Sequence, residues 1–193
     1  ALTIDLRNYG QSSIVSNYEN LGLSEYKDVL GAFDFLQKIG FKKNQIGLHG
    51  ISLGASTVIF AAEKEPHIKA IWSESSLAEF NMILQDEISR YGAPHNFGPA
   101  VSFAGKVLTG IDPRKLSPVY ALSKQQQYFF THGEKDQRIL IKHFNFIKQY
   151  VLSNNINADF WSAKDAYHVD AMLKYPDEYG MKMKNFFEKY LSK

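Results

Sequence analysis

The 193-residue sequence contains no cysteine, which excludes a disulfide framework and any metal site built on thiolates. No apolar run approaches the roughly 18 residues that a membrane-spanning helix requires. The formal net charge is only +2, and the one dense basic stretch is the tail at residues 182–193. We interpret this tail as the solvated face of a helix, so nucleic acid is not expected as a partner.

Two kinds of catalytic motif are also missing. The sequence has no His-Glu-x-x-His pattern, the spacing typical of zinc-dependent hydrolases. Gly47 and Gly50 lack the third glycine of a dinucleotide-binding turn, and there is no glycine-rich phosphate loop. We therefore expect neither a metal nor another cofactor.

What the sequence does contain is an alternation of apolar runs and helical patterns. Hydrophobic residues make up 45% of the chain, enough to bury the core of one domain. The alternation is typical of βαβ units, so we predict an α/β fold with a mostly parallel sheet and helices on both faces. The predicted strands cover residues 1–6, 45–49, 67–72, 127–131 and 158–161. The predicted helices cover residues 26–39 (with Ser24 as N-cap), 55–64, 77–91, 99–109, 140–152 and 176–191.

The stretch Gly50-Ile51-Ser52-Leu53-Gly54 lies between a predicted strand and a predicted helix. In that context Gly-x-Ser-x-Gly is typical of a nucleophile elbow, a strained turn that raises the serine above the sheet. We expect both glycines to be required, because the chain folds back too tightly for side chains. The N–H of Leu53 would form half of an oxyanion hole. The alternative is an ordinary surface turn.

A serine nucleophile needs a histidine to take its proton and a carboxylate to orient that histidine. In parallel sheets, groups that act together lie beyond the carboxyl ends of strands. Asp136 follows the strand at 127–131 and His168 follows the last strand. The order Ser52, Asp136, His168 is that of the α/β-hydrolases. Other acids near these positions remain alternatives: Glu134, Asp165 and Asp170.

The remaining histidines are expected to have other roles. His49 and His132 each precede a glycine at a strand end, which favours packing or hydrogen bonding beneath the site. His143 is expected on the exposed face of a helix. His67 lies at the wrong end of the sheet, and His95 lies between the third and fourth predicted strands.

Several stretches resemble the α/β-hydrolase superfamily, and more narrowly the bacterial hydrolases related to serine aminopeptidases and prolyl oligopeptidases. They are DLRNYGQS at 5–12, GISLGA at 50–55, SP at 117–118, HGEKD at 132–136, HVDA at 168–171 and YPDEY at 175–179. The resemblance implies one α/β-hydrolase domain over residues 1–193, with residues 73–123 as a short helical cap. It does not imply a substrate, because this fold hosts many chemistries.

The resemblance also implies that part of the fold is encoded elsewhere. In the family, the Asp5-x-Arg7 stretch follows the fourth strand of an eight-stranded sheet. The N-terminal strands, and the loop that supplies the second oxyanion N–H, would then lie outside this sequence. We expect the chain to be the C-terminal portion of a larger hydrolase, with a missing N-terminal segment as its partner.

Within the cap, Leu77, Phe80, Leu84, Ile88 and Tyr91 recur along one face of a predicted helix. Four apolar residues are candidates for an acyl or alcohol pocket, the alternative being that they only pack the cap onto the sheet. These four are Phe80, Leu84, Phe97 and Phe103.

We expect a serine hydrolase that cleaves a small to medium, apolar carboxylic ester through an acyl-enzyme intermediate. A first alternative is a peptidase or acyltransferase of the same fold. A peptidase needs a group to hold a substrate amine or carboxylate, for which Glu74, Glu79 or Arg90 are candidates. A second alternative is a binding protein that has the fold without the activity.

Overall fold

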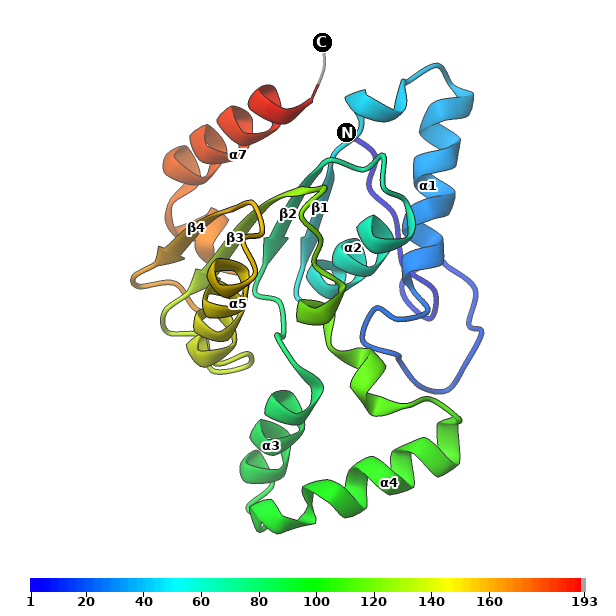
Figure 1. Ribbon diagram of the computed structural model, residues 1–193, viewed down its shortest axis with the longest axis vertical. Helices are drawn as coiled ribbons and strands as arrows, with labels where there is room; N and C mark the ends of the chain where they lie inside the picture. The colour runs from blue at the N-terminus through cyan, green and yellow to red at the C-terminus, as the bar shows by residue number, and fades with distance from the viewer. Residues whose placement is uncertain (192–193) are drawn as a thin grey trace.

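A computed structural model describes residues 1–191, which form an α/β fold around one four-stranded sheet (Figure 1). The strands are β1 (Leu48–Ile51), β2 (Ala70–Glu74), β3 (Gln127–Gly133) and β4 (Ala158–Ala163). They lie in the order β1-β2-β3-β4, and every neighbouring pair is parallel. All of β2 and nearly all of β3 are buried, as expected for strands covered on both faces. The predicted parallel sheet is confirmed.

Helices connect and flank these strands. The helices are α1 (Tyr26–Lys38), α2 (Leu53–Lys64), α3 (Phe80–Arg90), α4 (Gly98–Thr109), α5 (Ile141–Ser153), α6 (Ala171–Lys174) and α7 (Pro176–Tyr190). The short 3-10 helices are η1 (Lys43–Gln45), η2 (His95–Phe97), η3 (Pro113–Leu116) and η4 (Pro118–Ala121). No helix within residues 1–191 is both long enough and apolar enough to cross a membrane.

The two faces of the sheet carry different helices. On one face, Ile71, Tyr128 and Phe130 pack with α2 and α5, and α1 packs on the outside of α2. On the other face, Trp72 and Phe129 pack against α7 (Figure 1). Side chains alternate between the faces of a strand, so adjacent residues of β2 and β3 serve two separate cores. Helices therefore cover both faces, as predicted.

The N-terminal prediction is wrong. Residues 1–6 are irregular rather than a strand, and residues 1–5 are exposed. A strand is stabilised by backbone hydrogen bonds to a neighbour, and none of the described strands pairs with this segment. Side chains hold the following loop instead. The Asp5 carboxylate accepts the Gln11 N–H at 3.0 Å, and Arg7 pairs with Asp28 of α1 at 2.7 Å.

The predicted cap of α1 is also wrong. Helix α1 begins after Glu25, and no side chain caps it. The hydroxyl of Ser24 instead accepts a hydrogen bond from the Asn20 side chain at 2.8 Å. The buried carboxylate of Glu25 accepts the N–H groups of Asn20, Gly22 and Ser24.

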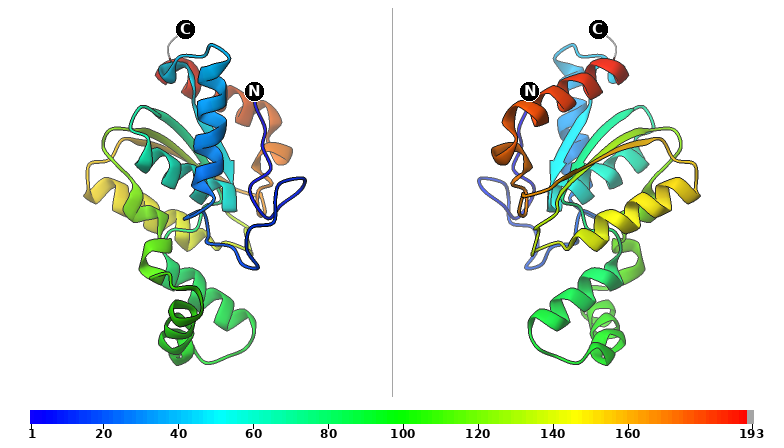
Figure 2. Two further views of the ribbon diagram at one scale, coloured as in Figure 1. Left: turned by 90° about the vertical axis from the view of Figure 1, so that its right-hand side faces the viewer. Right: turned by 90° about the vertical axis from the view of Figure 1, so that its left-hand side faces the viewer.

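Beyond the carboxyl ends of the strands, α3 and α4 project away from the body of the molecule (Figures 1 and 2). They belong to the segment between β2 and β3, where the sequence predicts an insertion. Its two ends meet at its base. The Val119 N–H donates to the Ala78 carbonyl at 3.2 Å, and the Phe80 N–H donates to the Ser117 hydroxyl at 2.9 Å.

The predicted apolar face of α3 is right only in part. Leu77 and Ile88 are buried and Phe80 and Leu84 are partly buried, but Ile83 and Asp86 lie outside the predicted set. Ile83, Asp86 and Ile88 are buried, whereas Tyr91 is 84% exposed just beyond the helix. A charged residue on the buried face breaks the apolar repeat, and Asp86 is accommodated because α5 supplies partners for it.

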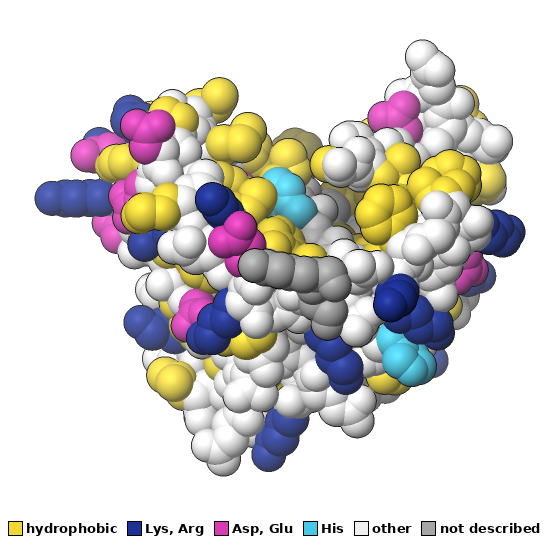
Figure 3. Space-filling view, turned by 90° about the horizontal axis from the view of Figure 1, so that it is seen from above, with side chains coloured by type: hydrophobic (Ala, Val, Ile, Leu, Met, Phe, Trp, Pro, Cys, Tyr) yellow, Lys and Arg dark blue, Asp and Glu magenta, His cyan; other side chains and the backbone are white. Residues whose placement is uncertain are grey.

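The opposite end of the molecule differs in character. There, apolar side chains surround a hollow, and Lys and Arg side chains lie toward the periphery (Figure 3).

Candidate active site

The strand-turn-helix at Ser52 has the geometry of a nucleophile elbow. Ser52 lies between β1 and α2 with φ 51° and ψ −115°, a conformation that costs a non-glycine residue of order 1–3 kcal/mol. Its N–H donates to the Glu74 carbonyl at 2.9 Å, which ties the turn to β2. Leu53 is the first residue of α2, so the helix itself offers no acceptor for its N–H.

The two glycines of the elbow are not equivalent. A Cβ on Gly50 would lie 2.1 Å from the Gly54 carbonyl oxygen, so the first glycine permits the chain to fold back. A Cβ on Gly54 would meet nothing within 4 Å. The prediction that both positions exclude side chains is therefore right for Gly50 and wrong for Gly54. A Cβ at position 50 would collide with the backbone of residue 54. Every residue has that backbone, so the collision does not require glycine at position 54.

The three predicted side chains come together at the carboxyl end of the sheet. His168 Nε2 lies 2.9 Å from Ser52 Oγ, and His168 Nδ1 lies 2.8 Å from Asp136 Oδ2. Because an ionised carboxylate only accepts, Nδ1 carries the proton, and Nε2 is free to accept the Ser52 hydroxyl. The arrangement can therefore transfer the serine proton to the imidazole.

Asp136 is buried and held in one orientation. Its Oδ1 accepts the backbone N–H groups of Arg138 at 2.8 Å and Ile139 at 2.9 Å, which leaves Oδ2 for His168. Burial acts to raise the pKa of Asp136, but His168, the Ile139 N–H and His132 outweigh it and hold the pKa below its usual value. The carboxyl group is therefore ionised at neutral pH.

The alternative acids point elsewhere. Glu134 accepts the Ser162 hydroxyl at 2.7 Å, and Asp165 pairs with Lys135 at 2.7 Å on the surface. Asp170 accepts the Tyr167 N–H at 3.4 Å. Only Asp136 among these acids contacts the His168 ring among the described residues.

His132 lies beneath the site, as predicted. It is 1% exposed, and its Nε2 donates to the Ile139 carbonyl at 2.8 Å and lies 3.4 Å from Asp136. Burial lowers the pKa of His132, so the ring is neutral. It braces the turn that presents the two N–H groups to Asp136.

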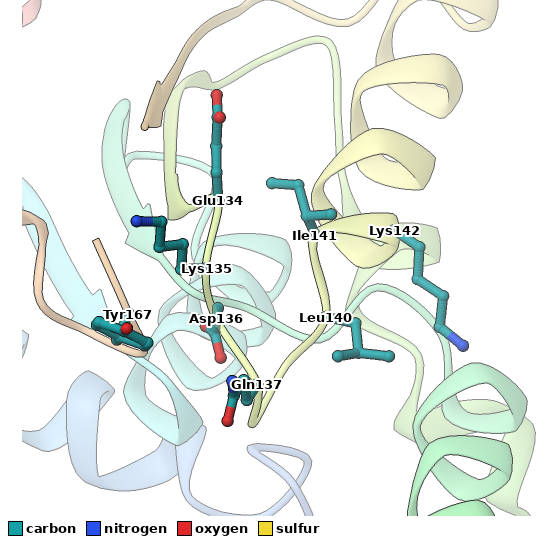
Figure 4. Close-up of a pocket in the computed structure, with 8 residues that line it drawn as sticks. All are labelled: Glu134, Lys135, Asp136, Gln137, Leu140, Ile141, Lys142 and Tyr167. Carbon is teal, nitrogen blue, oxygen red and sulfur yellow. The ribbon is translucent and has the colours of Figure 1, made fainter. Parts of the chain in front are cut away.

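Beside Asp136 a hollow of about 480 Å³ opens between the Asp136 loop, the start of α5 and Tyr167 (Figure 4). Its wall carries Glu134, Lys135, Gln137, Leu140, Ile141 and Lys142. A second hollow of about 510 Å³ lies between the N-terminal segment and α1. Among the side chains that the structure describes, no group of three or more His, Asp or Glu residues could hold a metal ion.

The sequence profile of one family, described as the prolyl oligopeptidase family, matches residues 6–193. The chain belongs to the prolyl oligopeptidase family. The predicted resemblance to α/β-hydrolases of this group is confirmed. The members of the prolyl oligopeptidase family are serine hydrolases. A comparison with curated proteins gives no significant match.

Solved structures share the fold of this prolyl oligopeptidase family chain. An esterase from Pyrococcus furiosus superposes with a TM-score of 0.72 at 18% identity, covering 97% of this chain and 70% of the esterase. An acylaminoacyl peptidase from Pyrococcus horikoshii gives 0.68 at 21% identity, covering 89% of this chain but only 28% of that protein. A puromycin-hydrolysing peptidase from Mycobacterium tuberculosis gives 0.67 at 14% identity, covering 90% and 26%.

The four predicted substrate-contacting residues of this family member lie on three elements of the insertion, α3, η2 and α4. Phe80 and Leu84 are partly buried on α3, whereas Phe97 and Phe103 are 54% and 70% exposed. None of the four lines either hollow described above. Their role in binding an acyl or alcohol group stays a prediction.

The three candidates for anchoring a peptide terminus all have internal partners. Glu74 is buried and accepts the Tyr179 hydroxyl at 2.7 Å. Glu79 accepts the Met82 N–H at the start of α3. The Arg90 guanidinium donates to the carbonyls of residues 137 and 138 at 3.0 and 3.1 Å.

The prediction for His143 is wrong. Its ring is fully buried between α5 and the insertion, where Nδ1 accepts the Ala78 N–H at 3.0 Å and Nε2 donates to Asp86 at 3.0 Å. Lys142 also pairs with Asp86. No signal in the sequence predicted this pair, because Asp86 lies outside the predicted apolar face of α3 and only the fold places it against α5.

Two further residues that sequence reasoning missed shape the His168 loop. A Cβ on Gly133 would lie 2.3 Å from the Tyr167 carbonyl oxygen, so this glycine lets the loop pass close to the end of β3. Ser75 accepts the Val169 N–H at 3.4 Å, directly after the catalytic candidate His168. The sequence signal for Gly133 is a glycine at a strand end, and Ser75 gives none.

Proposed function

We propose that this chain hydrolyses a small to medium, apolar carboxylic ester, with Ser52 as nucleophile, His168 as general base and Asp136 as the orienting acid. The observation that carries the proposal is the continuous chain of contacts from Ser52 through His168 to Asp136, at 2.9 and 2.8 Å. No cofactor takes part.

In the proposed reaction, Ser52 Oγ attacks the ester carbonyl while His168 Nε2 takes its proton. The N–H of Leu53 donates to the oxyanion as one half of the oxyanion hole. The imidazolium then protonates the leaving alcohol, and the acyl group stays on Ser52. A water molecule, deprotonated by the same nitrogen, then attacks the acyl carbonyl. The bond from the acyl carbon to Ser52 Oγ breaks, the imidazolium returns the proton to that oxygen, and the acid is released. Asp136, ionised at neutral pH, stabilises the imidazolium in both steps.

Two observations favour an ester over a peptide as substrate. The acids and the arginine that would hold a peptide terminus are engaged in internal contacts. The insertion presents apolar side chains with Lys106 as the only charge among residues 97–110. A peptidase or acyltransferase activity of the same site is the second candidate, favoured by the peptidases that share the fold.

The strain at Ser52 argues against a role as a binding protein. The elbow conformation costs stability, and a scaffold without activity gains nothing from it. A strained serine next to a histidine with a buried carboxylate behind it is the arrangement that activates a nucleophile.

The test is a substrate panel on the chain and on Ser52→Ala. We expect hydrolysis of p-nitrophenyl esters from acetate to decanoate, little hydrolysis of aminoacyl p-nitroanilides, and a loss of about 10⁴-fold or more in Ser52→Ala. Preference for the anilides would replace the esterase proposal by the peptidase one. Equal rates in the chain and in Ser52→Ala would overturn both.

A further inference from the structure

One side chain of the projecting insertion reaches the loop of the proposed catalytic acid. Arg90, the last residue of α3, donates from its Nη2 atom to the backbone carbonyls of Gln137 and Arg138, at 3.0 and 3.1 Å. Glu87, one turn earlier on α3, lies 3.5 Å from Arg90 Nη1 and also pairs with the Arg138 side chain. These contacts join the insertion to the residues that directly follow Asp136.

The two carbonyls belong to the same peptide groups that hold Asp136. The N–H groups of Arg138 and Ile139 donate to Asp136 Oδ1 at 2.8 and 2.9 Å. The carbonyl of residue 137 and the N–H of residue 138 form one peptide group, and the carbonyl of residue 138 and the N–H of residue 139 form the next. Each of these two peptide groups is therefore bonded to Arg90 at its oxygen and to Asp136 at its hydrogen.

A hydrogen bond at one end of a peptide group affects the other end for two physical reasons. The group is planar and trans, so its C=O and N–H point in opposite directions, and fixing one fixes the other. A cation at the oxygen also polarises the peptide group, which strengthens the hydrogen bond that its N–H donates. Arg90 supplies both effects to both of the N–H groups that hold Asp136.

The next carbonyl of the turn is held from the body of the molecule. The Ile139 carbonyl accepts a hydrogen bond from His132 Nε2 at 2.8 Å. Three successive carbonyls, those of residues 137–139, therefore each have a side-chain donor, and the donor is Arg90 for the first two and His132 for the third. Because His132 belongs to β3 and Arg90 to the insertion, the way the insertion lies on the body bears on the orientation of the acid.

We propose that Arg90 is a positioning residue for Asp136, which orients and polarises the two peptide groups that fix the carboxylate toward His168. It acts through the loop and does not touch the reacting atoms. The effect on catalysis rests on the proposed function. The effect on the loop does not, because it exists in the resting protein.

The first test is hydrogen exchange of individual backbone amides, followed by NMR, in the wild-type chain and in Arg90→Met. Methionine keeps an unbranched apolar stem and removes the donors and the charge, and the exposed position makes a folding defect unexpected. We expect the amides of Arg138 and Ile139 to exchange about tenfold faster, with those of β2 and β3 unchanged. The matched control is Lys115→Met, which removes one positive charge from an exposed position in η3 of the same insertion. It should leave both amides unchanged.

Urea denaturation of the two variants separates a local effect from a general loss of stability. Three results would overturn the proposal. They are unchanged exchange at residues 138 and 139 in Arg90→Met, an equal acceleration in Lys115→Met, and an acceleration that extends to the central strands together with a lower stability.

Kinetics with a p-nitrophenyl ester test the catalytic consequence. Arg90→Met should lower kcat about tenfold and leave KM within about twofold, because a misplaced Asp136 affects the chemical step rather than binding. A raised KM with unchanged kcat would mean that Arg90 contributes to substrate binding, which would overturn the positioning role. A wild type without activity would overturn the proposed function but leave the exchange result valid.

Discussion

The carboxyl end of the sheet and the projecting insertion are built in opposite ways. At the sheet, Asp136 and His132 are buried, each with several partners, and Ser52 is held in a strained conformation. In the insertion, α4 leaves its large apolar residues exposed. Gly98 is buried, while Phe103 and Leu108 are 70% and 82% exposed.

This contrast separates two tasks. Catalytic geometry requires atoms held within fractions of an ångström, which strands and their closing turns supply. The second task, binding an apolar part of the substrate, is one we propose for the insertion, and it needs area rather than exact placement. We therefore expect substitutions at the sheet to have large effects on rate and stability, and those on α4 to have small ones.

The largest expected effect is that of Asp136→Asn. Loss of the carboxylate removes the group that fixes the His168 tautomer, so kcat/KM for an ester should fall about 10⁴-fold. The matched control is Glu134→Gln in the same loop, whose side chain bonds Ser162 instead. It should change kcat/KM less than threefold. Steady-state kinetics check both variants, and a comparable loss in Glu134→Gln would mean that the acid is wrongly assigned.

The glycines of the elbow give the next largest effect. Gly50→Ala places a Cβ 2.1 Å from a backbone oxygen, so it should destabilise the fold by about 3 kcal/mol or more. Gly54→Ala meets nothing and lies in the first turn of α2, where alanine is the better helix former, so it should be neutral or slightly stabilising. Urea denaturation measures both. Similar losses in the two variants would contradict the described elbow.

The contact between α5 and the insertion, where the buried His143 ring bonds Ala78 and Asp86, should make the stability of the protein depend on pH. Burial lowers the pKa of His143 although Asp86 acts to raise it. The unfolded chain takes up a proton near pH 6.5 and the folded chain only at lower pH. Stability is therefore lost as pH falls below about 6.5, by up to about 1.4 kcal/mol per pH unit from this group. In His143→Gln this part of the slope should disappear from urea denaturation between pH 7 and 5. An unchanged slope would show that another group is responsible.

The smallest expected effect belongs to the outer face of α4. Phe103→Ser should change the free energy of unfolding by less than about 0.5 kcal/mol, because the side chain is mostly exposed already. Ile83→Ala, on the buried face of neighbouring α3, should cost about 2–4 kcal/mol. If Phe103 contacts the acyl group of the substrate, KM for long-chain esters will rise in Phe103→Ser while that for acetate stays the same. Thermal and urea unfolding, with kinetics on two chain lengths, check this pair.

The sequence predicted the site better than it predicted its surroundings. Ser52, Asp136 and His168 each follow a strand with a recognisable turn. The carboxyl ends of parallel strands all lie at the same edge of the sheet, so these residues lie close together. The same logic failed for residues 1–6, because a strand also needs a neighbour, which local pattern does not reveal. It failed for His143 and for Asp86 on α3, because an acid buried in one helix and a histidine buried in another are each unfavourable until the fold brings them together.

The central claim is that Ser52 is an activated nucleophile, and reaction with a fluorophosphonate probe tests it most directly. Intact-mass measurement after labelling should show a single adduct on the chain, peptide mapping should place it on Ser52, and Ser52→Ala should remain unlabelled. Labelling that persists in Ser52→Ala, or a folded wild-type chain that takes no label, would contradict the account.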